Sequence, residues 1–132
     1  MRYVLDAHAL LWFLLDHPKL GPAAKRVLSD PASDLVLPAI ALAEAAWIVS
    51  RRRTALTDVA AFFQSVTADP RIAIAPLNLA VVERGTRLTA VLEMHDRQIV
   101  ATALLIAEGG VPATLLTRDA NIVASGLIPI VW

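Results

Sequence analysis

The chain has 132 residues, no cysteine, and twelve basic against twelve acidic residues, so its formal charge is zero. This length suits one compact domain over residues 1–132, while the lack of cysteine excludes disulfides and thiolate metal sites and fits a cytoplasmic location. The hydrophobic fraction of 57% is high, but the longest charge-free run, Ala120–Trp132, is shorter than the roughly 18 apolar residues of a membrane span. We therefore expect a protein that does not enter a membrane and buries its elements on several faces.

Apolar segments of strand length and helix length alternate along the chain, separated by single prolines, glycines and capping residues. In the first half of the chain they predict a strand at Arg2–Leu5, helices at Ala7–Asp16 and Ala23–Ser29, a strand at Leu35–Leu37, and a helix from Ala39 to about Arg51 with Pro38 in its first turn. A helix capped by Thr57 or Asp58 follows and ends near Ala68, before a strand at Ile72–Ala75 and a helix from the cap Asn78 to about Val91. The last elements are a helix at Arg97–Glu108, a strand at Ala113–Thr117, a short helix begun by Asp119, and a strand at Ile128–Val131. This alternation, with continuously apolar strands, favours an α/β fold with a parallel sheet covered on both faces.

Three aspartates stand where such a fold places its chemistry. Ligands of open α/β sheets bind at the carboxyl ends of the strands. Asp6 follows the first predicted strand, Asp119 follows the fourth, and Asp96 begins the helix that leads into the fourth. Each could instead cap the start of a helix, where an aspartate accepts hydrogen bonds from free backbone N–H groups. Taken singly, the three positions therefore leave both interpretations open.

Glu44 differs, because it lies inside a predicted helix and caps nothing. Its helical neighbours three and four positions away are all apolar, which predicts that its carboxylate projects from a buried face. An unpaired buried charge is costly. A salt bridge to a distant arginine or a divalent cation shared with other carboxylates would compensate it.

Four carboxylates and no cysteine form a donor set for a hard cation. Mg²⁺ prefers carboxylate oxygen and water, and Mn²⁺ accepts the same ligands. Carboxylates that converge without a cation repel one another, so their assembly makes physical sense chiefly when a metal is bound. Such a metal activates water and stabilises the charge that develops on a phosphodiester, which predicts a hydrolase.

The segments around these carboxylates are LDAHALLW at residues 5–12, Glu44, HDRQIVATA at residues 95–103, and LTRD at residues 116–119. They resemble the PIN domain of VapC-type toxin ribonucleases, and the resemblance covers essentially the whole chain. It implies a PIN-like three-layer sandwich with a central, mostly parallel sheet of about five strands and helices on both faces. It also implies endoribonuclease activity with Mg²⁺ or Mn²⁺ held by Asp6, Glu44, Asp96 and Asp119, a homodimer, and inhibition by a cognate antitoxin of VapB type that occupies the active-site groove.

Two departures from the family pattern concern the immediate surroundings of the carboxylates. Ala7 stands where the family often has Ser or Thr, so a hydroxyl that could assist the metal site is missing. Glu93-Met94-His95 precedes Asp96 in place of a turn with glycine or proline. Both bear on rate and geometry, since neither removes a carboxylate.

Further residues admit two interpretations each. Arg97 and Arg118 adjoin site aspartates and either bind substrate phosphate or balance the carboxylates, and Thr117 could hydrogen-bond an aspartate. The three arginines at positions 51–53 either bind RNA phosphates or form a solvated helix end that the helix dipole favours. His8 and His95 are poor ligands beside hard oxygens and could instead act as general acids. Asn121 is expected to serve the first turn of the last helix. Trp12 and Trp47 are expected in the core.

Two other functions compete with the ribonuclease. One is a non-catalytic PIN-fold module that binds RNA or protein for regulation, for which Ala7 is the only indication. The other is a phosphoacceptor receiver domain, which needs an early acidic pair and a late lysine. The only lysines are Lys19 and Lys25, so we set the receiver domain aside.

Overall fold

The computed structural model describes residues 1–132 and contains one five-stranded sheet in the order β3-β2-β1-β4-β5. All four strand pairs are parallel, so the sheet is entirely and not only mostly parallel. The strands are β1 (Arg2–Leu5), β2 (Asp34–Pro38), β3 (Ile72–Ala75), β4 (Ala113–Leu116) and β5 (Ile130–Val131). The helices are α1 (Ala7–Leu14), α2 (Pro22–Ser29), α3 (Ala39–Ser50), α4 (Val59–Ala68), α5 (Leu79–Thr86), α6 (Met94–Glu108) and α7 (Ala120–Ser125).

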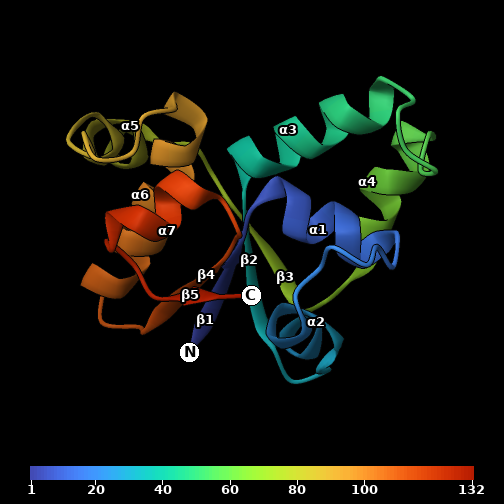
Figure 1. Cartoon of the computed structure of the whole chain (residues 1–132), viewed down its shortest axis with the longest axis horizontal. Helices are drawn as coiled ribbons and strands as arrows, with labels where there is room; N and C mark the ends of the chain where they lie inside the picture. Colours follow the sequence, from blue (N-terminus) through green and yellow to red (C-terminus); the bar gives the residue numbers. More distant parts are fainter.

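Helices cover the sheet from both sides. In Figure 1 helices α1 to α4 lie to the right of the strands, and α5, α6 and α7 lie to the left. The central strands have apolar, fully or almost fully buried side chains, as in Val4, Leu5 and Leu115, because each face packs against helices. This confirms the predicted α/β sandwich and explains the high hydrophobic fraction as the composition of a two-sided core.

The strand order reverses beside β1. From β1 the chain builds outward through β2 to β3, then returns to place β4 on the other side of β1. Leu5 pairs with Leu116 in register, and the Asp6 N–H continues this pairing by donating to the Leu116 carbonyl at 3.3 Å. This reversal is a topological switch point, and open α/β sheets bind ligands in the crevice outside the carboxyl ends of the strands at such a point.

Several predicted boundaries were wrong. Helix α6 begins at Met94 and not at Arg97, because Glu93 acts as its cap and accepts a hydrogen bond from the Asp96 N–H. Helix α5 ends at Thr86, well before Val91, and β5 starts only at Ile130. Pro38 is the last residue of β2 and precedes α3, as its extended backbone requires.

Asn121 lies in α7 but serves a different segment from the one expected. Its amide donates to the Ala90 carbonyl and accepts from the Leu92 N–H. It therefore fixes the loop before α6 and does not cap its own helix. Asp58 caps α4, so Thr57 does not. No helix has both the length and the apolar character that crossing a membrane requires.

Arg71, directly before β3, joins three parts of the chain. Its guanidinium donates to the carbonyls of Leu28 and Asp30 at the end of α2 and forms two hydrogen bonds with the Asp69 carboxylate. The Arg71 and Asp69 side chains are only 18% and 21% exposed. Hydrogen bonds to the Arg71 guanidinium lower the pKa of Asp69 from its ordinary value of 3.8.

We expect Arg71→Met to lower the free energy of unfolding by about 2 kcal/mol near neutral pH, since it removes several charge-assisted hydrogen bonds. Because folding lowers the pKa of Asp69, its ion pair with Arg71 stabilises the fold fully at pH values above the ordinary pKa of Asp69. This stabilisation is lost as the pH falls through the lowered pKa. Urea unfolding should thus give a smaller difference from wild type in acid. Arg26→Met, which removes an exposed arginine without an ion-pair partner, is the control, and an equal loss in both variants would contradict the anchoring role.

Candidate active site

Asp6 and Asp119 lie at the carboxyl ends of the adjacent strands β1 and β4. The Asp6 carboxylate is 9% exposed, and its Oδ1 accepts a hydrogen bond from the Ala9 N–H at 2.7 Å, which caps α1. The Asp119 Oδ1 accepts from the Ile122 N–H at 2.9 Å and caps α7. Both side chains are therefore helix caps, and the same bonds fix their carboxylates at the crevice.

Glu44 reaches the same end of the sheet from α3, which follows β2. The salt bridge that could have compensated it is absent, because no basic side chain forms an ion pair with its carboxylate. The prediction of a buried face was wrong. The buried side of α3 consists of Ala41, Ala45 and Val49, while Glu44 is half-buried and Trp47 is 60% exposed.

Asp96 stands in the first turn of α6, but its side chain caps nothing. The capping carboxylate belongs to Glu93, which accepts from the Asp96 N–H. The Asp96 carboxylate has neither a hydrogen bond nor an ion pair within the chain, although it is half-buried. The capping interpretation of Asp96 is therefore wrong.

The four carboxylates lie within electrostatic reach of one another. Burial and then repulsion from Asp119, Glu93, Glu44 and Asp6 raise the pKa of Asp96 from 3.8 to about 6. Burial, with a smaller repulsion from Asp6, raises the pKa of Glu44, while His8 opposes the rise. Burial also raises the pKa of Asp6, against a hydrogen bond from Thr117 and with a small contribution from Asp119. The sequence analysis thus selected residues that the fold brings to one edge.

These side chains do not yet form a coordination sphere. No group of three or more His, Asp or Glu side chains is close enough to hold a metal ion as the side chains stand. The donor set is nevertheless the right chemical type, since it consists of carboxylate oxygens without compensating cations. Asp6 and Asp119 are fixed by capping bonds, whereas Glu44 and Asp96 are held by no hydrogen bond. Rotation of the latter two would be needed to close the group around an ion.

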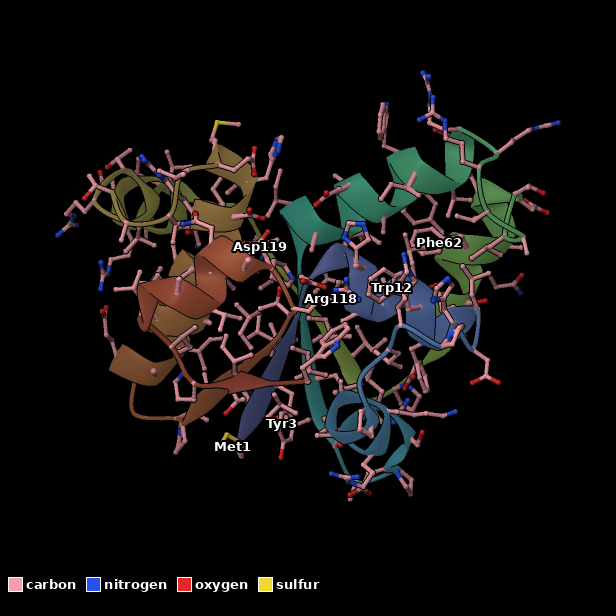
Figure 2. The ribbon with its side chains drawn as sticks, viewed as in Figure 1. Met1, Tyr3, Trp12, Phe62, Arg118 and Asp119 are labelled. Carbon is pink, nitrogen blue, oxygen red and sulfur yellow. The ribbon has the colours of Figure 1, made fainter.

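Thr117, Arg97 and Arg118 have three different environments. Thr117 is fully buried, and its hydroxyl accepts from the Asp119 N–H, so the prediction that it bonds an aspartate is confirmed. Arg97 donates to the Val91 carbonyl and forms no ion pair with Asp96. Arg118 is exposed and lies over the Trp12 ring, with its Cζ 5.3 Å from the ring centroid (Figure 2). Neither arginine balances a site carboxylate by direct pairing.

The two tryptophans expected in the core lie at the surface to different degrees. Trp47 is exposed and carries the Arg51 guanidinium over its ring at 5.3 Å. Trp12 is partly buried and packs against the core. The prediction failed for Trp47 because α3 is apolar on nearly every side, so its sequence does not distinguish the buried face.

Glu93 contributes to the site but was not among the predicted site residues. Its carboxylate caps α6, pairs with His95 Nδ1 at 3.0 Å, and contributes to the repulsion that raises the pKa of Asp96. The signal was its position three residues before Asp96, the spacing at which a cap accepts from a backbone N–H. Glutamate is an uncommon cap, which hid this signal.

One family model matches most of the chain, and several solved structures share its fold. The model of the PIN domain family matches residues 3–125. A search of curated protein sequences gives no match. Similar solved structures include FitAcB from Neisseria gonorrhoeae, with a TM-score of 0.69, 18% identity, and coverage of 97% of this chain and 95% of that one. VapBC-1 from nontypeable Haemophilus influenzae has a TM-score of 0.69 and 18% identity, covering 99% and 97%.

VapC20 from Mycobacterium tuberculosis is also similar in structure and is described as a toxin that cleaves the sarcin-ricin loop. Its TM-score is 0.70 at 12% identity, and the alignment covers 94% of this chain and 95% of that one. At such low identity these likenesses establish a common fold. The expected PIN-like architecture is therefore confirmed by the family match and by the observed sheet.

The burial of the Asp96 carboxylate and the crowding of carboxylates around it predict that Asp96→Asn stabilises the metal-free protein. A pKa raised from 3.8 to about 6 corresponds to about 3 kcal/mol of strain in the charged form, and screening at this half-exposed side chain reduces it to about 1 kcal/mol. The folded state binds the Asp96 proton more tightly than the unfolded state does. The destabilisation of the folded state is therefore absent below the ordinary pKa of Asp96 and complete above its raised pKa.

Urea unfolding in chelator should therefore show Asp96→Asn more stable than wild type by about 1 kcal/mol near pH 7.5 and equal to it near pH 4. Glu83→Gln, an exposed α5 carboxylate without an ion pair, should change little. A less stable Asp96→Asn protein would argue against repulsion among the four carboxylates.

Proposed function

The chain belongs to the PIN-domain family, and we propose that it is a toxin-like endoribonuclease that hydrolyses RNA phosphodiester bonds with Mg²⁺ or Mn²⁺. The observation that carries the proposal is the set of uncompensated carboxylates at the carboxyl edge of the sheet. Asp6, Glu44, Asp96 and Asp119 come from four separate segments, and none has a basic partner. A fold keeps such repulsion where function requires it.

In this proposal the four carboxylates divide the work of binding the ion. Asp6 and Asp119 each use one oxygen to cap a helix and present their second oxygen to the crevice. Glu44 and Asp96, whose carboxylates no hydrogen bond holds, would complete the set of ligands. The Thr117 hydroxyl, itself fully buried, opposes the rise in the pKa of Asp6 that burial causes.

A bound Mg²⁺ or Mn²⁺ supplies a water activated for attack and stabilises the charge that develops on the scissile phosphate. The protein's part is to keep the donors in place and to hold the attacked phosphate. Because its pKa is raised to about 6, Asp96 is protonated in part just below neutral pH and would release that proton when a cation binds. Loss of Asp96 should therefore affect metal binding and cleavage together.

The relatives support the substrate and the partner. One structural neighbour is described as a toxin that cleaves an RNA loop, and others are toxin–antitoxin complexes. We infer RNA as the substrate and an antitoxin of VapB type as the inhibitor of this chain. Trp47, an exposed apolar side chain beside Glu44, is typical of surfaces that bind protein.

We also infer a homodimer. Leu79, Leu92 and Met94 are 71%, 78% and 58% exposed on or beside α5 and α6, and a monomer gains nothing from exposing them. Light scattering should give about twice the 14.2 kDa chain mass. Replacing Leu92 and Met94 by serine should shift the measured mass toward that of one chain. A wild-type protein with the mass of one chain would contradict the dimer.

The central test is RNA cleavage by the purified chain. We expect wild type to cut total cellular RNA with Mg²⁺ or Mn²⁺ and to stop in chelator. Asp96→Asn should cut at least about 100-fold more slowly, because an essential metal ligand is lost. Fragment ends give the cleavage sequence.

The Asp96→Asn protein also controls for unfolding, since it is predicted to be more stable than wild type. Glu83→Gln serves as the matched carboxylate control and should cut as wild type does. Cleavage that survives in both chelator and Asp96→Asn would refute the metal mechanism. If a folded wild-type protein binds Mn²⁺ or RNA without cutting, the chain is the non-catalytic regulatory module that Ala7 first suggested.

A further inference from the structure

A cleft with no role in the proposed metal site lies beside the carboxylates. It is formed between α1 and the end of α3 with the loop that follows, and its volume is about 490 Å³. Its walls include His8, Trp12, His17, Ile48, Arg53 and Thr54. The volume falls in the range of about 300 to 1,000 Å³ that is common for small-molecule and cofactor sites.

One wall of the cleft is made of flat rings. The Trp12 and His17 rings are stacked, 5.3 Å apart with an angle of 21° between their planes. His8 packs against the other part of Trp12 at 5.3 Å. His17 is held in this position because its Nδ1 accepts the Lys19 N–H at 3.0 Å. The rings therefore form a prearranged, half-exposed platform.

Cations surround this platform, and none of them has an acidic partner. The Arg118 Cζ and Lys19 Nζ lie 5.3 Å and 6.0 Å from the Trp12 ring centroid, and Arg53 lines the cleft from the other side. These three side chains form no ion pair, and no carboxylate lines the cleft. Figure 2 shows Arg118 and Trp12 next to each other, with Asp119 just beyond at the start of α7.

Two short stretches of chain link the cleft and its cations to the carboxylate site. His8 is two residues after Asp6, and its electrostatic influence reaches both Asp6 and Glu44. Arg118 directly precedes Asp119. A strand of nucleic acid whose phosphate lies at the carboxylates thus has its next nucleotide within reach of the cleft.

From this arrangement we propose that the cleft is a nucleotide subsite for single-stranded RNA. The base of a nucleotide next to the cleaved bond packs against the Trp12–His17 platform, and Arg53 contacts the phosphate beyond it. The proposal rests on the ribonuclease function above and adds a requirement: the cleaved segment must be unpaired, so that its base can leave the stack.

The chemistry of the walls favours RNA over a peptide. Single-stranded nucleic acids are bound by aromatic stacking together with a positively charged groove, and both features occur here. An apolar peptide segment would cover Arg53, Lys19 and Arg118 without neutralising them, which is costly. An acidic peptide would pair with these cations but would place no ring against the Trp12–His17 platform.

The test uses binding in chelator, where cleavage cannot occur, of a fluorescein-labelled mixed-sequence RNA 12-mer, single-stranded or annealed to its complement. The variants are His17→Ala, which shortens the platform, and Arg53→Gln, which removes the cation. Arg26→Gln on α2 is the control, because it also removes an exposed, unpaired arginine. Thermal unfolding midpoints verify that all the proteins are folded.

We expect His17→Ala to weaken single-strand binding by about 5- to 10-fold without changing its salt dependence, as the loss of a stacking contact does. Arg53→Gln should weaken binding and reduce the slope of log K against log salt by about 0.7, as the loss of one phosphate contact does. Wild type should prefer the single strand to the duplex, and Arg26→Gln should match wild type.

The outcomes separate this proposal from the ribonuclease assignment. If wild type cleaves cellular RNA but the two cleft variants bind and cut as Arg26→Gln does, the subsite is refuted and the ribonuclease stands. If the cleft variants handle RNA normally but lose affinity for an antitoxin, the cleft is a protein site and the subsite is likewise refuted. If wild type neither binds nor cuts RNA, the ribonuclease assignment is refuted, and the subsite that rests on it is refuted with it.

Discussion

The parallel pairing of β1 with β4 is the constraint on which the candidate site depends. These strands are distant in sequence, and their register places Leu5 beside Leu116, so the chain leaves both strands at the same edge. Each exit begins a helix, and a helix start needs an acceptor for its free N–H groups. Asp6 and Asp119 meet this need with one oxygen each. Capping and ligand placement are thus one arrangement, and the two interpretations that the sequence left open for these aspartates are compatible.

That arrangement has an electrostatic cost which the rest of the fold must offset. Glu44 and Asp96 complete a group of carboxylates that has no basic partner, and burial and repulsion raise the pKa of Asp96 to about 6. The compensation comes from elsewhere, in the two-sided apolar core and in anchors such as Arg71, which ties α2 to β3. Stability and site chemistry are therefore located in different parts of the molecule, as is common where function requires unfavourable local electrostatics.

How far the sequence predicts this protein follows from which signals are local. Strand and helix alternation and aspartates after strands are local patterns, so the α/β fold and the positions of Asp6 and Asp119 at the sheet edge were predictable. The grouping of Glu44 and Asp96 with them rested on the family resemblance. The start of α6 was missed because its cap is Glu93, an uncommon acceptor. The exposure of Trp47 was missed because α3 is apolar nearly all round. Asn121 was misassigned because its partners, Ala90 and Leu92, belong to a distant loop. Contacts of this kind arise only from the tertiary arrangement.

A formal charge of zero conceals a separation of charge that bears directly on function. Arg2, Lys25, Arg71 and Arg84 form ion pairs with carboxylates, and these pairs lie outside the candidate site. At the site the charges are unpaired and sorted by sign: carboxylates at the sheet edge, and Lys19, Arg53 and Arg118 around the neighbouring cleft. These two groups could have neutralised each other, yet no ion pair joins them. A divalent cation would compensate the first group and a phosphate chain the second, so the proposed RNA strand beside a metal ion would complete both.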